Sequence, residues 1–246
     1  MSIAYSDTTN KDGIIQRIEQ ELGFADGYIS GDATRLKFWT GSINLALDKA
    51  FHIIFGADGR WQFDDSNHTK NPFIFTDLTI NQRTYNFTAD EQSNLILDIH
   101  SVYARSSASN PYYLLTPRDL QSEGDTVFTD GLTRTGWPTS YDKTGNGIKL
   151  DITPEATVSP GLQIFINREG SYFTTSDTTK VPGFAGLYHE YLVLESCYRH
   201  ARANTLKKQE AFKRDVLEME KAMTDYYSRR ARDDRQMMST KKISFR

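Results

Sequence analysis

The sequence contains a single cysteine, Cys197, among its 246 residues. One thiol excludes an intrachain disulfide framework and any zinc or iron–sulfur site that several cysteines would have to build. Cys197 stands in an apolar stretch with helical spacing, where we expect a small buried core residue. Residues 1–10 lack the basic and apolar halves of a secretory signal, so we expect a protein that folds in a reducing cytosol.

Long apolar runs are also missing. No stretch approaches the roughly eighteen apolar residues that cross a bilayer, so we expect no contact with a membrane. Enzyme motifs are equally scarce: there is no GxSxG, no P-loop and no GxGxxG after a strand. His189-Glu190 begins like the HExxH zinc signature, but Val193 occupies the position of the second histidine. We therefore expect neither a catalytic centre nor a metal or other cofactor.

Charge is distributed unevenly, although the whole chain carries a net charge of only −3. Residues 201–246 hold thirteen Lys and Arg against seven Asp and Glu, a net charge of +6, which leaves −9 on residues 1–200. The last sixteen residues, 231–246, are polar and basic and extend past any apolar periodicity. This pattern predicts a C-terminal arm that meets an acidic partner.

Helical spacing of apolar residues predicts helices near the N-terminus. The first is expected at residues 9–22 with Thr9 as its N-cap, and the second at residues 32–55 with Asp32 as its N-cap. Gly41 inside the second helix predicts a close contact with another helix. The core-facing residues expected in this helix are Leu36, Ile43, Leu47, Phe51 and Ile54.

The helical pattern returns after Pro182-Gly183. A wide apolar face extends to Ala201, Asn204-Thr205 predicts a break, and a further helix is expected to run to about Arg230. The residues expected to face inward from this last helix are Phe212, Val216, Met219, Met223 and Tyr226.

Between residues 61 and 181 the helical spacing gives way to short alternating runs separated by turn residues. Alternation predicts strands around residues 95–100, 148–152 and 162–167, and Glu169-Gly170 predicts a turn into a further strand. An antiparallel sandwich or small barrel fits this region best.

The fold class predicted from these patterns is α+β. Residues 1–60 and 182–230 are expected to form one helical bundle, because the N-terminal helices are too short to bury themselves alone. Residues 61–181 are then an inserted β domain, and residues 231–246 are an extended arm.

One acidic segment could carry chemistry. Asp64, Asp65 and His68 could bind a divalent cation, or one carboxylate could act as a general acid. The other interpretation, which we favour, is a structured turn in which Trp61 and Phe63 anchor the junction between helix and sheet. Neighbouring residues in a strand point to opposite faces, which argues against the two aspartates acting together.

Taken in order, three segments resemble the head-to-tail adaptor (neck or connector) proteins of tailed bacteriophages. They cover most of the chain, and their order and spacing carry the resemblance more than any one of them. The first is residues 44–50 (NLALDKA) leading into 61–67 (WQFDDSN), the second is 78–87 (LTINQRTYNF), and the third is 198–203 (YRHARA) with 213–215 (KRD) and 226–230 (YYSRR).

The resemblance implies a late structural protein of the virion neck, assembled in the host bacterial cytoplasm and without enzymatic activity. Members form a ring, commonly of twelve subunits, beneath the portal of the filled capsid. Expected partners are copies of the chain itself, the portal protein, tail or nozzle proteins, and double-stranded DNA that passes without sequence specificity. The large β insertion departs from the smallest members, which are wholly helical.

The resemblance also assigns roles to residues. The arm is expected to dock on the portal, and the long helices are expected to form the ring wall. Expected portal-binding residues are Arg229, Arg230, Arg232, Arg235, Lys241, Lys242, Phe245 and Arg246. Expected subunit-interface residues are Tyr191, Tyr198, Phe212 and Tyr226.

Two alternatives stay open at this stage. One is a virion-associated, carbohydrate-active hydrolase that uses acids near Asp64 or Asp98. The other is a carbohydrate-binding or nucleic-acid-binding module, for which salt-dependent binding of DNA by the C-terminal arm would be the sign.

Overall fold

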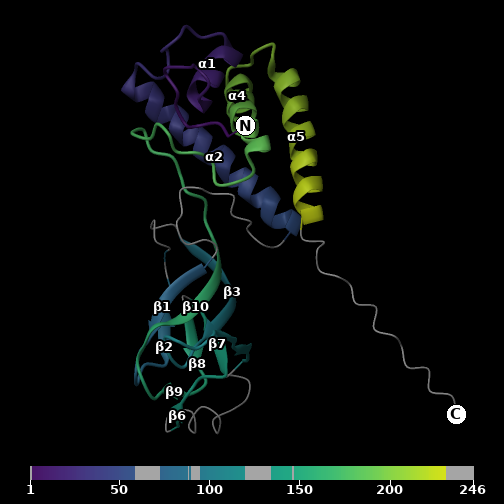
Figure 1. Ribbon diagram of the computed structural model, residues 1–246. Helices are drawn as coiled ribbons and strands as arrows, with labels where there is room; N and C mark the ends of the chain where they lie inside the picture. The colour runs from purple at the N-terminus through teal and green to yellow at the C-terminus, as the bar shows by residue number, and fades with distance from the viewer. Residues whose placement is uncertain are drawn as a thin grey trace, which may run out of the picture.

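The computed structural model describes residues 2–58, 73–87, 89, 95–119, 134–145 and 147–230. These residues form a mixed α and β protein, in agreement with the predicted class. The helices gather at one end of the molecule and the strands at the other (Figure 1). Two separate clusters of buried apolar side chains correspond to these two regions.

The helical region contains segments from both ends of the chain. Residues Ile14–Leu22 form α1 and Ala33–Asp58 form α2, while Glu190–Ala203 form α4 and Gln209–Arg230 form α5. Helices α2, α4 and α5 all contact one another, and α1 packs against α4. A 3₁₀ turn, η1, spans Gly186–Tyr188 just before α4.

Helix α1 begins five residues later than the predicted start at Thr9. The carboxylate of Asp7 accepts hydrogen bonds from the backbone N–H groups of Thr9 and Asn10, at 3.1 and 2.9 Å, and holds them in a separate turn. Gly23 ends the helix at φ 72°, a left-handed conformation that favours glycine. The predicted end of the helix is therefore confirmed and its predicted beginning is wrong.

Helix α2 begins as predicted, because Asp32 caps it. Its Oδ1 accepts from the backbone N–H groups of Thr34 and Arg35, both at 2.9 Å. The predicted core stripe is also confirmed, with Leu36 only partly buried. The prediction for Gly41 is wrong within this chain, since a Cβ at this position would meet no atom within 4 Å.

Helices α4 and α5 complete the helical core. Cys197 is fully buried, as predicted, and burial raises the pKa of its thiol. Along α5 the side chains of Phe212, Val216 and Met223 face inward, whereas Tyr226 is 39% exposed. The tyrosine that completes the inward stripe is Tyr227, so the prediction for Tyr226 is wrong.

Within the described ranges, the strands form two four-stranded sheets and a two-stranded one. The first sheet has the order β1-β10-β3-β4, the second β2-β8-β7-β5, and β6 pairs with β9. Most pairs are antiparallel, as predicted, but the short pairs β5–β7 and β6–β9 are parallel. The strands are β1 (Phe73–Leu78), β2 (Thr84–Asn86), β3 (Ile96–Ala104), β4 (Tyr113–Leu114), β5 (Thr116–Pro117), β6 (Thr135–Gly136), β7 (Ser140–Thr144), β8 (Gly147–Leu150), β9 (Thr153–Pro154) and β10 (Val158–Arg168).

Alternation of apolar residues explains the long central strand β10 and fails in its neighbour β3. In β10 Leu162, Ile164 and Ile166 are buried, as their spacing predicts. In β3 the register with β10 shifts twice, which moves Leu97 to the surface with 51% of its area exposed. A β-bulge changes the face that a side chain occupies, so a period of two holds only between bulges.

The chain returns from the strands to the helices through residues 169–174. Strand β10 ends at Arg168, and the predicted strand at residues 171–174 is not formed. Gly170 lies against the ring of Phe51 in α2, where a Cβ would not fit. The hydroxyl of Tyr172 donates to Asp48 of α2 at 2.6 Å, and the ring of Phe173 joins the helical core. This segment therefore belongs to the helical region.

Candidate docking surface at the end of helix α5

The candidate site lies in the last two turns of α5, just before the basic stretch begins. Arg229 is exposed there, and Arg230 is the last residue of the helix. The remaining predicted portal-binding residues lie outside the described part of the chain, as do the acids of the segment around His68. These residues are Arg232, Arg235, Lys241, Lys242, Phe245, Arg246, Asp64 and Asp65.

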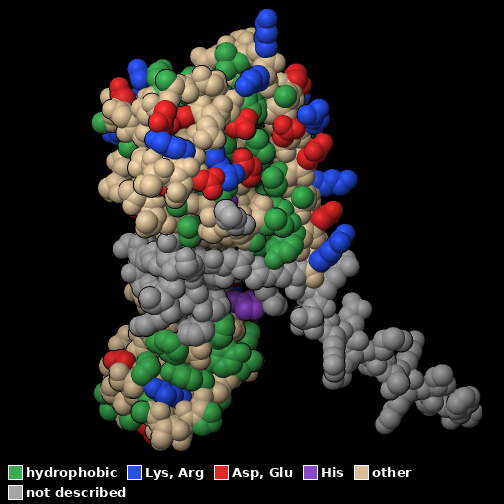
Figure 2. Space-filling model, turned by 45° about the horizontal axis from the view of Figure 1, so that its top comes forward, with side chains coloured by type: hydrophobic (Ala, Val, Ile, Leu, Met, Phe, Trp, Pro, Cys, Tyr) green, Lys and Arg blue, Asp and Glu red, His purple; other side chains and the backbone are tan. Residues whose placement is uncertain are grey.

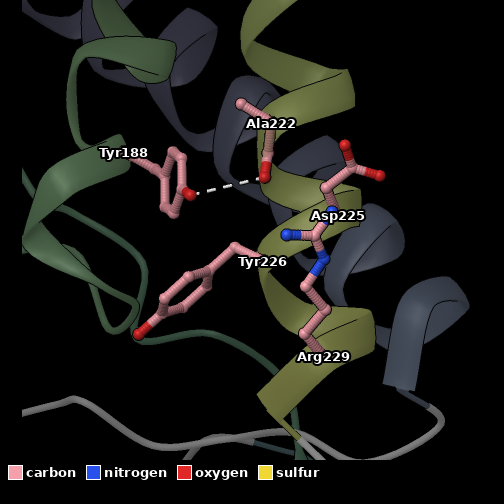
Figure 3. A pocket seen from close by; sticks show the side chains of 5 residues that line it. All are labelled: Tyr188, Ala222, Asp225, Tyr226 and Arg229. Atoms are coloured by element: carbon pink, nitrogen blue, oxygen red, sulfur yellow. Dashed lines mark hydrogen bonds between the residues drawn. The ribbon is translucent and has the colours of Figure 1, made fainter.

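A pocket of about 410 Å³ opens on this part of α5. It is lined by Tyr188 of η1 and by Ala222, Asp225, Tyr226 and Arg229 of α5. Figure 3 shows the two tyrosine rings on one side of the pocket and the side chain of Arg229 extending back along the helix toward Asp225. The spacing of four residues brings Asp225 and Arg229 onto one helix face. The pocket thus combines an aromatic wall with one cation and one anion.

Three tyrosines hold the wall of the pocket in place. The rings of Tyr188 and Tyr226 lie 5.4 Å apart, and those of Tyr226 and Tyr227 lie 5.1 Å apart at nearly a right angle. The hydroxyl of Tyr188 donates to the carbonyl of Ala222 at 3.3 Å, and that of Tyr227 accepts from the backbone N–H of Ala185 at 3.0 Å. Two buried, bonded rings therefore support one exposed ring, that of Tyr226.

The electrostatics of the pocket keep the hydroxyl of Tyr188 protonated. Burial raises the pKa of Tyr188, and the neighbouring Tyr226 and Asp225 raise it further. A neutral phenol remains a hydrogen-bond donor at neutral pH. An arginine side chain carries a positive charge at physiological pH. The pocket can therefore bind a partner that offers an apolar or aromatic side chain together with a carboxylate.

The structure separates the four residues expected at a subunit interface. Tyr191 and Phe212 lie inside the helical core of their own chain, with 0% and 4% of their surface exposed, so their assignment to an interface is corrected. The hydroxyl of Tyr191 donates to Glu220 at 2.9 Å and joins α4 to α5. Tyr198 is partly buried, and Tyr226 is the most exposed of the four.

The other polar residues singled out in the sequence have structural partners. Asp98 forms an ion pair of 3.1 Å with Lys143 on the surface of the strands. His189 is buried: its Nδ1 accepts from the backbone N–H of Ile3 at 3.0 Å, and its Nε2 lies 2.9 Å from the carbonyl of Phe184. Among the residues that the structure describes, no three His, Cys, Asp or Glu side chains come together as a metal site.

Sequence reasoning missed Tyr188, Ala222 and Asp225 as parts of this site. Tyr188 belongs to the apolar face that precedes α4, and nothing in its spacing distinguishes a residue at a pocket from a core residue. The pair Asp225 and Arg229, four residues apart, was the signal that could have located the site.

No helix of the described residues is both long enough and apolar enough to span a bilayer. The outward face of α5 carries charges of both signs along its length (Figure 2). Neither the comparison with known protein families nor the comparison with curated proteins finds a match to this chain.

Proposed function

We propose that the protein is a structural adaptor in the neck of a tailed bacteriophage. Copies of the chain form a ring, with twelve subunits as the expected number, that joins the portal of the head to the tail and extends the DNA channel. In this proposal the segments from both chain ends make one helical bundle, and the strands form an inserted sandwich or barrel. The observation that carries it is the tyrosine pocket at the end of α5, directly before the basic residues 231–246.

The position of the pocket supports docking by the end of the chain. A basic segment binds an acidic surface through many weak contacts, and the ordering of any such segment on its partner costs conformational entropy. Tyr226, with Arg229 beside it, offers a fixed aromatic contact directly before this segment. A contact there reduces the length of chain that has to be ordered on binding. Tyrosine and arginine are also the residues that most often dominate the binding energy of protein interfaces.

The packing of the helical region supports a role as a wall of a ring. Its core contains residues from both ends of the chain, so the helices that flank the strands in sequence pack together around one core. The net charge of −9 on residues 1–200 suits a channel through which DNA has to slide without binding.

The test is binding of the full chain to the portal assembly of the same phage. We expect deletion of residues 231–246 to abolish binding, and Tyr226→Ala with Arg229→Ala to raise the Kd at least tenfold. Lys207→Ala is the control and should leave the Kd unchanged, because Lys207 is exposed in the turn that precedes α5, far along the helix from the pocket. Electron microscopy of the complex should show a ring beneath the portal. Full affinity of the truncated protein would refute the assignment of the arm.

A further inference from the structure

An apolar groove of about 870 Å³ runs between α2 and the C-terminal end of α4, away from the tyrosine pocket. Phe38 and Leu45 of α2 line it and remain 64% and 52% exposed. Gly41 lies between them on the same helix face, and a Cβ there would meet no atom within 4 Å. The groove is therefore an open hollow between two apolar walls, a shape that receives side chains from another helix.

The charged residues that line the groove are cationic. Arg199 and Arg202 lie on its α4 side, and no carboxylate belongs to the described residues of its lining. Lys49 continues the line of Leu45 one turn further along α2. The carboxylate of Glu195 is buried, and its Oε1 binds both Lys49, at 2.7 Å, and Arg199, at 2.8 Å. One buried anion cannot balance these three cations, so the groove keeps an excess of positive charge.

Both guanidinium groups are held beside the groove. Arg199 is fixed by Glu195 and also lies 3.5 Å from the carbonyl oxygen of Leu45, across the groove on α2. Arg202 is exposed, and its guanidinium lies 5.8 Å from the centre of the Tyr198 ring. An exposed cation at the rim of an apolar groove favours a partner that brings a carboxylate to it.

The exposed apolar segments of the chain itself do not match this charge. The exposed ring of Tyr28 lies 4.0 Å from the guanidinium of Arg35. Leu217 shares its face of α5 with three cations and two glutamates, so that face is cationic as well. Residues 231–246 hold five Lys and Arg against two Asp. Each of these segments would add positive charge to a groove that already has an excess of it.

We propose that the groove between α2 and α4 receives an acidic amphipathic helix of another protein. Apolar side chains of that helix fill the hollow over Gly41, and carboxylates beside them meet Arg199 and Arg202. An amphipathic helix bound in this way places its apolar anchors three and four residues apart. The opposite charges at the rim fix its position and select against basic helices. The inference does not rest on the proposed function, because it concerns a different surface from the end of α5.

Protection of a thiol placed in the groove tests this contact on the full chain. Cys197 is the only cysteine and is fully buried, so Gly41→Cys supplies the only accessible thiol. The probe is a synthetic amphipathic peptide of about eighteen residues, or about five helical turns, with leucines on one face and glutamates beside them. We expect it to slow alkylation of this thiol about tenfold when about nine in ten grooves are occupied.

Two controls accompany this measurement. A peptide with lysine in place of every glutamate keeps the apolar face and should leave the rate of alkylation unchanged. The acidic peptide should also leave the rate unchanged when the thiol is at Gln20→Cys, an exposed position on α1. The Kd is taken from the protection itself, so binding of the peptide elsewhere on the chain does not contribute to it.

Matched substitutions, each combined with Gly41→Cys, separate the groove from the charge of the whole chain. Arg202→Glu should raise the Kd of the acidic peptide about tenfold or more, because it places a repelling charge at the rim. Lys221→Glu makes the same change of charge on the exposed face of α5 and should leave the Kd unchanged. Leu45→Ser should weaken binding, whereas Leu217→Ser changes a side chain of similar exposure and should not.

Four results would overturn the inference. Equal protection by the acidic and the basic peptide would show an apolar contact without selection by charge. Equal weakening by Arg202→Glu and Lys221→Glu would assign the effect to the overall charge. Protection that grows with the concentration of the protein alone would identify a second copy as the occupant. Absence of protection by the acidic peptide would show that the groove does not receive such a helix.

Discussion

The side-chain amide of Asn44 forms hydrogen bonds with both backbone groups of Phe173. Its Nδ2 donates to the carbonyl oxygen and its Oδ1 accepts from the backbone N–H, each at 2.9 Å. Asn44 lies in the middle of α2, and Phe173 lies where the chain leaves the strands. The amide thus replaces the strand partner that this segment lacks among the described residues, and it fixes the returning chain on α2.

Replacement of Asn44 should therefore destabilise the protein. We expect Asn44→Ala to lower the free energy of unfolding by about 1–3 kcal/mol, because two partly buried backbone groups lose their partner. Asn44→Asp keeps the acceptor and removes the donor, so it should give an intermediate loss. Urea unfolding of the three proteins measures both effects. Equal stability of Asn44→Ala and the unmodified protein would show that water replaces the amide without cost.

The adjacent tyrosines of α5 should respond differently to loss of the hydroxyl. Tyr227→Phe removes the acceptor of the Ala185 N–H and should cost about 1 kcal/mol of stability or more. Tyr226→Phe changes an exposed ring and should stay within about 0.5 kcal/mol of the unmodified protein. Thermal or urea unfolding of the two variants measures these losses. A larger loss in Tyr226→Phe than in Tyr227→Phe would contradict the assignment of Tyr227 as the buried tyrosine.

A buried carboxylate links α2 and α4. Glu195 is 1% exposed, and its Oε1 lies 2.7 Å from Nζ of Lys49 and 2.8 Å from Nε of Arg199. We expect Glu195→Gln to lower the free energy of unfolding by about 2–4 kcal/mol, since it leaves two cations at this contact without their anion. Glu218→Gln, on the exposed face of α5, is the matched control and should have little effect. Comparable losses in the two variants would contradict this role of Glu195.

Stability should depend on the protonation of His200. Its ring lies 5.0 Å from that of Trp39 and 5.9 Å from that of Phe24, and burial lowers its pKa below the usual 6.5. The unfolded chain therefore binds a proton at a higher pH than the folded chain does. As the pH falls below about 6.5, the unfolded state gains protons first and the free energy of unfolding decreases.

The measurement is the free energy of unfolding of the unmodified protein and of His200→Gln at pH 7.5 and 5.5. We expect the variant to lose less stability than the unmodified protein over this interval. An equal loss in both would assign the pH dependence to other groups.

Local rules account for much of the fold. Asp32 predicts the start of α2 because an aspartate side chain can satisfy free N–H groups only at a helix end, and Gly23 predicts the end of α1 through its left-handed backbone. The alternation in β10 is equally local. The predicted start at Thr9 is wrong because the carboxylate of Asp7 accepts a hydrogen bond from the backbone N–H of Thr9. This bond holds Thr9 in a separate turn before the helix.

Contacts between distant segments account for the errors. Tyr226 and Tyr227 lie fourteen and fifteen residues after Phe212, and the helical period places them almost equally far from the centre of the buried face. The choice between them depends on Ala185, whose N–H reaches only Tyr227. The surface position of Leu97 depends in the same way on the register of β10. Of the candidate site, the sequence indicated Arg229 and Tyr226, but the fold alone brings Tyr188 beside them.

The origin of the helical core from both chain ends has a consequence for synthesis on the ribosome. Helices α1 and α2 emerge more than 130 residues before α4, the element that covers them. Synthesis proceeds at roughly 5–20 residues per second, so the apolar faces of α1 and α2 stay exposed for several seconds or longer before α4 is made. The strands leave the ribosome in between and can pair first. Nascent chains are therefore most vulnerable to proteases and to aggregation before α4 has been translated.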